Sequence, residues 1–88
     1  MNDALAASTL VLRLYVAGQT PNSMLALANV QAALDGNAHN LEVVDVLEHP
    51  ERALDDGVFV TPTLVRLAPE PERTMIGSLT NLPHSWFY

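Results

Sequence analysis

The spacing of apolar residues changes from a period of two to a helical period across one short turn. Residues 10–17 alternate strictly, and both faces of the alternation are mostly apolar, which predicts a strand in the interior of a sheet. Gly18 allows a sharp turn, Thr20 stands at a candidate N-cap, and Pro21 suits the first helical position because its missing N–H costs nothing there. The predicted helix runs to a stop at Gly36 and Asn37, and its core-facing positions are Met24, Leu27, Val30, Gln31 and Leu34.

The rest of the chain predicts three more strands and one short helix. Residues 41–47 are rich in β-branched side chains, so they form a second strand parallel to the first, with a right-handed helical crossover. Residues 50–57 begin with proline and end with glycine, as a short helix does. In the third strand, residues 58–67, Pro62 marks the start of pairing because it cannot donate to a ladder. With a fourth strand at 73–76, the order β-α-β-α-β-β is typical of a thioredoxin-like α/β fold with a mixed four-stranded sheet.

The two ends of the chain are expected to differ in role. Residues 1–9 are predicted to be a flexible tail, and residues 10–88 a single domain. A thioredoxin-like domain usually ends in a helix of about three turns, but Pro83 limits residues 78–82 to about one turn. This truncated C-terminal helix leaves a sheet face to be covered by a second subunit or by the aromatic end of the chain, Trp86, Phe87 and Tyr88.

Composition and charge exclude several classes of function. The chain has 88 residues and a formal net charge of −6, with four arginines and no lysine. Such a chain offers no electrostatic footprint for nucleic acid or anionic membranes, and no apolar run is long enough to span a bilayer. We therefore expect a cytoplasmic protein. The absence of cysteine removes thiolate nucleophiles, disulfides and cysteine metal sites.

Several short motifs stand in register over Leu12 to about Leu79. They are Tyr15-Val16-Ala17-Gly18 followed by Thr20-Pro21-Asn22-Ser23, then Asp45-Val46-Leu47, Thr61-Pro62-Thr63-Leu64 and Ile76-Gly77. Together they resemble the KaiB family, the small thioredoxin-like partners of the circadian clock ATPase KaiC. The resemblance implies a protein that is not an enzyme and needs no cofactor, and that binds a KaiC-like ATPase and modulates a clock. It also implies a family able to adopt a second fold that differs in the C-terminal half, while the likeness to thioredoxin-like folds implies a cis bond before Pro62.

Two other functions remain open beside this one. The chain could be a divergent adaptor, or a sensor-type domain of a histidine kinase pathway, with a different protein partner and no role in a clock. It could also be a thioredoxin-fold transferase that binds a thiol cofactor at the turn formed by residues 20–23, although the chain shows no basic pocket for one. Turnover with glutathione and an electrophile tests that last function.

The turn before the first helix stands where redox-active thioredoxin relatives carry Cys-x-x-Cys. Thr20 and Ser23 take the places of the two thiols, and a hydroxyl has a pKa too high to act as a thiolate does. We expect no catalytic residue here. The turn is interpreted as a capping device, with an anion or partner contact at the helix start as the alternative. No metal site is expected, because the histidines lie far apart in sequence, at His39, His49 and His84.

The carboxylates are interpreted as surface residues and not as catalytic groups. Asp55 and Asp56, with Glu48 and Glu51, are interpreted as a solvated acidic face. Asp45 admits two interpretations. It lies either on an exposed edge of the second strand, which we favour, or it caps buried backbone near the turn before the first helix.

The first predicted helix departs from the family where a partner surface is expected. Leu25, Ala28 and Gln31 stand where typical members carry basic residues, so electrostatic docking on an acidic KaiC surface is weakened. Leu25, Ala28 and Ala32 instead form an apolar stripe away from the core-facing side, which predicts a homo-oligomer or a different partner. The cations left for partner contacts are Arg52, Arg66 and Arg73.

Overall fold

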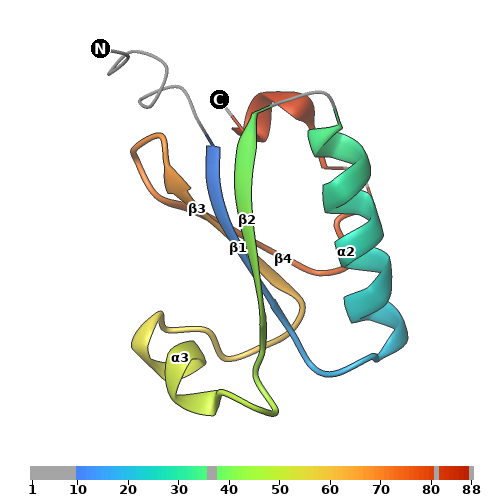
Figure 1. Ribbon diagram of the computed structural model, residues 1–88, viewed down its shortest axis with the longest axis vertical. Helices are drawn as coiled ribbons and strands as arrows, with labels where there is room; N and C mark the ends of the chain where they lie inside the picture. The colour runs from blue at the N-terminus through green and yellow to red at the C-terminus, as the bar shows by residue number, and fades with distance from the viewer. Residues whose placement is uncertain (1–9, 36–37, 81, 88) are drawn as a thin grey trace.

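The computed structural model describes residues 10–35, 38–80 and 82–87, which form one mixed four-stranded sheet with helices on both faces (Figure 1). The elements are β1 (Leu10–Val16), α2 (Pro21–Leu34), β2 (His39–Asp45), α3 (Pro50–Asp55), β3 (Thr63–Ala68), β4 (Arg73–Ile76) and the 3₁₀ helix η1 (His84–Phe87). The strand order is β2-β1-β3-β4, with β1 parallel to β2, β3 antiparallel to β1, and β4 antiparallel to β3. This confirms the predicted thioredoxin-like α/β fold and the interior position of the first strand. Within the described residues no helix is long and apolar enough to cross a membrane.

Strand β1 supplies side chains to a separate core on each face of the sheet. Successive residues of a strand point to opposite faces, so Leu14 is buried toward α2 and Tyr15 is buried toward α3. The core on the α2 side consists of Leu10, Leu12, Leu14, Val16, Ala26, Val30, Leu34, Leu64, Leu79, Trp86 and Phe87. The core on the α3 side is smaller and consists of Tyr15, Val44, Ala53, Val58 and Val65. The two helices therefore lie on opposite faces of one sheet.

The buried face of α2 differs in part from the predicted one. Val30 and Leu34 are buried as expected, but Met24 is 48% exposed and Gln31 also lies on the surface. Ser23 and Ala26 are buried in their place, because their small side chains let the helix lie close to the sheet. The helix ends at Leu34 with Asp35 as its C-cap. The predicted stop at residues 36–37 lies outside the described residues, as does the predicted tail at 1–9.

The C-terminal segment closes the α2 side of the sheet. Residues 78–80 and 82 are not helical, which is within the limit of about one turn set by Pro83, and the helical segment is η1, which begins after Pro83. Trp86 and Phe87 lie edge to face with their ring centroids 5.5 Å apart, and both are buried in the α2-side core. The aromatic end thus covers the sheet face, which is one of the two covers predicted from the sequence. Tyr88 lies outside the described residues.

The strand boundaries follow two local features. β2 begins and ends two residues earlier than predicted. It begins at His39, which pairs with Leu10 of β1, and it ends at Asp45, whose side chain accepts a hydrogen bond from Leu47 N–H at 2.9 Å where the chain turns. β3 begins at Thr63, directly after Pro62, as a proline without an N–H requires. The Thr61–Pro62 peptide bond is cis, as expected from the likeness to thioredoxin-like folds.

Candidate partner-binding surfaces

The side chains that hold the turn between β1 and α2 are those of Ser23 and Asp45, whereas Thr20 contributes through its backbone N–H, which donates to the carbonyl oxygen of Ala17 at 3.3 Å. Thr20 occupies the N-cap position, but its side chain makes no capping hydrogen bond, so the predicted capping role of its hydroxyl is wrong. Ser23 lies one turn further on, where its buried hydroxyl oxygen accepts a hydrogen bond from Ala17 N–H at 3.0 Å. Pro21 begins the helix as predicted. Gly18 has φ +57, a left-handed backbone conformation that favours glycine.

Asp45 closes the same turn from the end of β2. Its Oδ1 accepts hydrogen bonds from Gly18 N–H at 3.0 Å and Leu47 N–H at 2.9 Å. The favoured interpretation, a side chain exposed on a strand edge, is therefore wrong, although β2 is an edge strand of the sheet. The carboxylate caps backbone on both sides of the crossover, as in the second interpretation. With these contacts satisfied internally, the turn is a structural corner.

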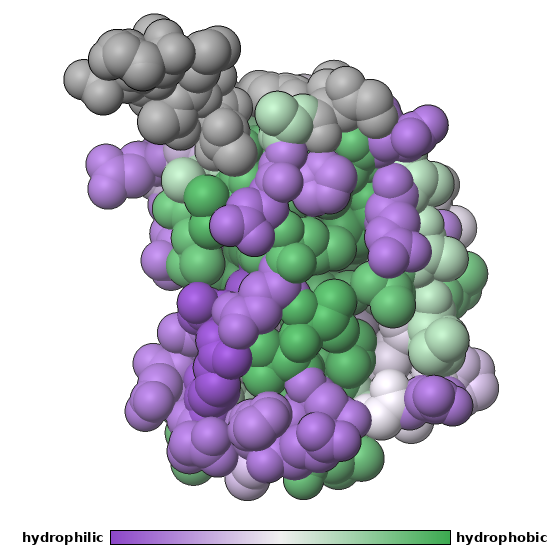
Figure 2. Space-filling model, viewed as in Figure 1, coloured by the Kyte–Doolittle hydropathy of each residue, from purple (hydrophilic) through white to green (hydrophobic). Residues whose placement is uncertain are grey.

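The outer side of α2 carries the apolar stripe expected from the sequence. Leu25 is 46% exposed, and Ala28 and Ala32 are also on the surface. We call these three residues the α2 stripe. The helix contains no Asp, Glu, Lys or Arg from Pro21 to Leu34, and in Figure 2 its edge of the molecule includes pale green, mildly hydrophobic residues. A partner would meet hydrocarbon and neutral polar groups here.

The prediction that Arg66 contacts a partner is wrong, because its side chain is buried. It is 1% exposed on the α2 face of β3, beneath the C-terminal segment. Its guanidinium donates to the carbonyl oxygens of Pro71 at 2.7 Å and Trp86 at 3.2 Å, and within the described residues its Nε has no acceptor. Desolvation by burial lowers the pKa of Arg66. The cation therefore holds the chain's own C-terminal segment.

Arg52 is held by ion pairs within the chain. Its two terminal nitrogens donate to the two carboxylate oxygens of Glu42 at 2.7 and 2.8 Å. Glu42 also accepts from Arg13 Nε at 2.9 Å. Hydrogen bonds from Arg52 and then Arg13 lower the pKa of Glu42 to about 2. Arg73 is exposed on β4, directly opposite the buried Arg66 in the antiparallel register of β3 and β4. The three predicted arginines therefore form no common exposed surface, because Arg66 is buried and Arg52 is paired with Glu42.

A buried tyrosine connects this ion-pair network to the sheet. The fully buried Tyr15 directs its hydroxyl to the carboxylate of Asp56 and to the carbonyl oxygen of Arg52, the latter at 3.1 Å. Arg13 donates to the same Asp56 carboxylate at 2.7 Å. Desolvation raises the pKa of Tyr15, and the hydrogen bond from Tyr15 lowers the pKa of Asp56. The network clamps α3 and the residue after it to β1 and β2.

This network corrects one interpretation, and its ion pairs were not predicted from the sequence. Asp56 is not part of a freely solvated acidic face, whereas Asp55 beside it is exposed as expected. The pairing of Arg13 with Glu42 follows from the parallel register of β1 and β2, in which these residues are partners. Opposite charges at matching positions of two predicted strands are a signal that the sequence contains. Within the described part of the chain no group of His, Asp and Glu is arranged to hold a metal ion.

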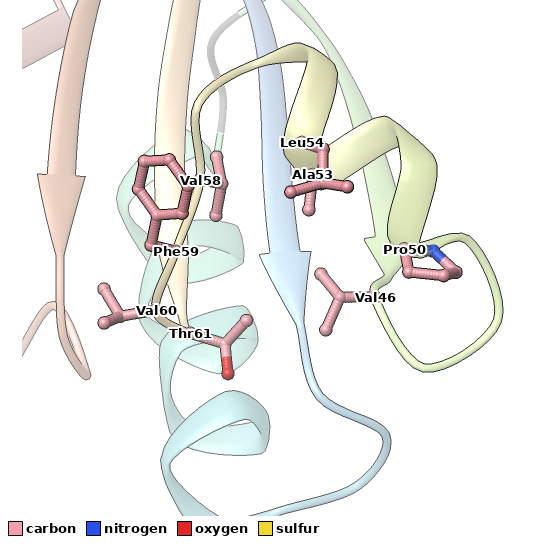
Figure 3. A pocket seen from close by; sticks show the side chains of 8 residues that line it. All are labelled: Val46, Pro50, Ala53, Leu54, Val58, Phe59, Val60 and Thr61. Atoms are coloured by element: carbon pink, nitrogen blue, oxygen red, sulfur yellow. The ribbon is translucent and has the colours of Figure 1, made fainter.

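An apolar groove beside α3 is a surface that the sequence pattern did not reveal. It has a volume of about 400 Å³ and lies on the sheet face opposite α2 (Figure 3). Its lining residues, which define the α3 groove, are Val46, Pro50, Ala53, Leu54, Val58, Phe59, Val60 and Thr61. Residues 58–60 were expected to belong to the third strand, but pairing begins only after Pro62, which leaves Phe59 83% exposed.

Solved structures with the same architecture place the chain among thioredoxin-like proteins. It is similar to a mutant thioredoxin from Halobacterium salinarum, with a TM-score of 0.70, 22% identity, and coverage of 98% of this chain and 82% of that one. It is also similar to the N-terminal domain of Synechococcus elongatus SasA, with a TM-score of 0.68, 27% identity, and coverage of 91% and 80%. Fold and turn thus define a thioredoxin-like protein that lacks the cysteine pair of redox-active members.

Sequence comparison identifies the particular family. The profile of the KaiB domain matches residues 13–85. The circadian clock oscillator protein KaiB of Prochlorococcus marinus strain MIT 9312 is 43% identical over 79 residues, covering 86% of this chain and 75% of the relative. KaiB of Thermosynechococcus vestitus is 45% identical over 76 residues, covering 83% and 70%. The chain belongs to the KaiB family, whose members are generally non-catalytic clock proteins.

Proposed function

We propose that this chain is a non-catalytic binding protein that docks on a KaiC-like ATPase through the α2 stripe and thereby modulates a circadian clock or a related output. Membership of the KaiB family supports a KaiC-like ATPase as the partner. The observation that carries the docking surface is the exposure of Leu25, Ala28 and Ala32 on a helix without charged residues.

The chemistry of this surface determines how binding should behave. Leu25 and the neighbouring Met24 are about half exposed, at 46% and 48%, so a partner that covers them gains apolar burial on the order of 1 kcal/mol for each side chain. The alanines allow close approach of a flat surface. Because α2 contributes no charge, the affinity should depend little on salt concentration.

A second candidate is a divergent adaptor with a different protein partner, or a chain that associates with itself. It is favoured by the neutral α2 together with the internal pairing of Arg52 and the burial of Arg66. A strongly acidic ATPase surface would meet few unpaired cations on this chain. Self-association through the α2 stripe would remove the same side chains from water.

A pull-down against KaiC-like ATPase rings locked in different nucleotide states tests the proposal. We expect the native chain to bind at least one state, and Leu25→Glu to lose binding by tenfold or more, because it places a carboxylate in an apolar contact. Leu47→Glu is the matched control, since Leu47 is 70% exposed and lies outside α2. Retention of full binding by Leu25→Glu, or no binding in any state, contradicts docking on the ring through this surface. Light scattering of both variants and the native chain measures self-association separately.

A further inference from the structure

The α3 groove is one of two hollows that lie on either side of Phe59, and the proposed function uses neither. The second hollow has a volume of about 260 Å³ and extends from the residues around Phe59 to strand β4. It is lined by Asp56, Gly57, Val58, Phe59, Val60, Thr63, Thr74 and Ile76. The two hollows share Val58, Phe59 and Val60, so they form a row across the end of the sheet.

Large apolar side chains are exposed along this row. Phe59 is 83% exposed, Leu54 67%, Ile76 62% and Val60 49%. Scattered apolar residues on a surface are ordinary, but a continuous set around a hollow usually marks a binding site. The close view shows the ring of Phe59 and the side chain of Leu54 among the residues that line the α3 groove (Figure 3).

The charges around the α3 groove are acidic. Glu48, Glu51 and Asp55 are exposed on or just before α3, the helix that supplies Pro50, Ala53 and Leu54 to the groove wall. Arg13 and Arg52 do not offset them, because they are bound to Glu42 and Asp56. Among the described residues, the basic groups beside the row of hollows are His49, whose Nδ1 lies 3.7 Å from Glu51, and the exposed Arg73 on β4, so the acidic charge is concentrated at the α3 end. Figure 2 shows hydrophilic residues over the part of the molecule where α3 lies in Figure 1.

This combination selects the chemistry of the occupant. Apolar hollows accept hydrocarbon side chains, and an unneutralised acidic rim attracts cations. Two hollows in a row suit an extended polypeptide better than a single compact ligand, which would fill one of them. A second copy of this chain is a poor occupant, because it has no lysine and, of its four arginines, Arg13, Arg52 and Arg66 are already engaged.

We propose that the α3 groove and the adjoining hollow bind an extended segment of a partner protein in which apolar side chains alternate with lysine or arginine. The site lies on the sheet face opposite α2, so it is a second docking site and does not depend on docking through the α2 stripe. One partner could occupy each face of the sheet at the same time.

Titration of the isotope-labelled full chain with three capped octapeptides, followed by amide NMR shifts, tests the proposal. One peptide alternates Leu with Lys, the second alternates Leu with Glu, and the third alternates Ser with Lys. We expect the first to bind at least tenfold more tightly than the others, with the largest shifts at Ala53, Val58, Phe59 and Val60. Equal or tighter binding of the second peptide, or shifts confined to α2, overturns the proposal.

Variants separate this site from the α2 stripe. Phe59→Ser should weaken binding of the first peptide at least tenfold without harming the fold, because the ring is mostly in solvent. Changing Glu51→Gln and Asp55→Asn together should weaken it several-fold and reduce its salt dependence. Leu25→Glu, the variant that tests the ATPase contact, should leave peptide binding unchanged. Unchanged affinity in Phe59→Ser, or loss in Leu25→Glu, contradicts an independent groove, whatever the pull-down with ATPase rings gives.

Discussion

The hydroxyl of Tyr15 can be removed by a single substitution that preserves the core around it. In Tyr15→Phe the ring stays in the α3-side core, while the contacts with the Asp56 carboxylate and the Arg52 carbonyl oxygen disappear. The experiment therefore isolates the hydrogen bonds that fasten the end of α3 to β1.

The structure sets the size of the effect. A hydrogen bond to a charged group contributes about 1.5–3 kcal/mol to stability. Asp56 keeps its ion pair with Arg13 at 2.7 Å, and its side chain is 28% exposed, so water replaces part of what is lost. We therefore expect a loss of about 2 kcal/mol in the free energy of unfolding at pH 7. For a domain of this size, that corresponds to a fall in Tm of about 8–16 °C.

The loss should also depend on pH in a defined direction. The pKa of Asp56 is lowered in the folded chain from its ordinary value of 3.8. The stabilisation that Asp56 contributes is therefore fully present above pH 3.8 and is lost as the pH falls through the pKa of the folded state. The pKa of Tyr15 is raised, so its contribution is present below 10 and is lost as the pH rises further. The difference in stability between the native chain and Tyr15→Phe should be constant from about pH 5 to 9 and shrink on both sides.

Urea unfolding followed by the fluorescence of Trp86 and by circular dichroism measures these differences. The chain contains a single tryptophan, and it is buried, so its emission reports loss of the core. Asp55→Asn is the control, because this exposed neighbour of Asp56 should change stability by less than about 0.5 kcal/mol. A change below about 0.5 kcal/mol in Tyr15→Phe, or a difference that does not vary with pH, refutes the assigned role of the network.

Two further substitutions test the corners of the fold. Asp45→Ala should lower the free energy of unfolding by about 2 kcal/mol, because it removes the acceptor of two backbone N–H groups. Asp45→Asn should lose much less, because an amide oxygen can still accept these hydrogen bonds. Equal losses for the two variants in urea unfolding would contradict the capping role. Arg66→Met should release the C-terminal segment, with a red-shifted Trp86 emission and stronger acrylamide quenching, whereas an unchanged spectrum would show that the cation does not hold it.

The sequence predicts the central strand well, for a physical reason. Residues 10–17 are mostly apolar on both faces, and only an interior strand with cover on both sides can bury such a pattern. Pro62 likewise fixes the start of β3, because the missing N–H cannot be compensated inside a ladder. Elements determined by such local chemistry are found at or near their predicted positions.

The errors come from residues whose environment is set by distant parts of the chain. Arg66 is buried because η1 returns over β3, 20 residues later. The aromatic residues at 86–88 indicate such a cover, but no local pattern shows that Arg66 lies beneath it. Arg13 and Asp56 meet across 43 positions in sequence. The α3 groove was missed because the apolar run before Pro62 predicts a strand, whereas the structure leaves it unpaired at the surface. Of the predicted partner surface, the α2 stripe is exposed as expected, because helical spacing alone places it away from the sheet.

The closing of the α2-side core by η1 has a consequence for synthesis on the ribosome. β1 emerges first, yet its antiparallel neighbour β3 and the aromatic rings that cover it come from the other end of the described chain. While the intervening residues are being made, the leucines of β1 remain without their final cover. The nascent chain therefore cannot complete this core until Trp86 and Phe87 have left the exit tunnel, and until then the leucines of β1 have only the part of their native cover that α2 supplies.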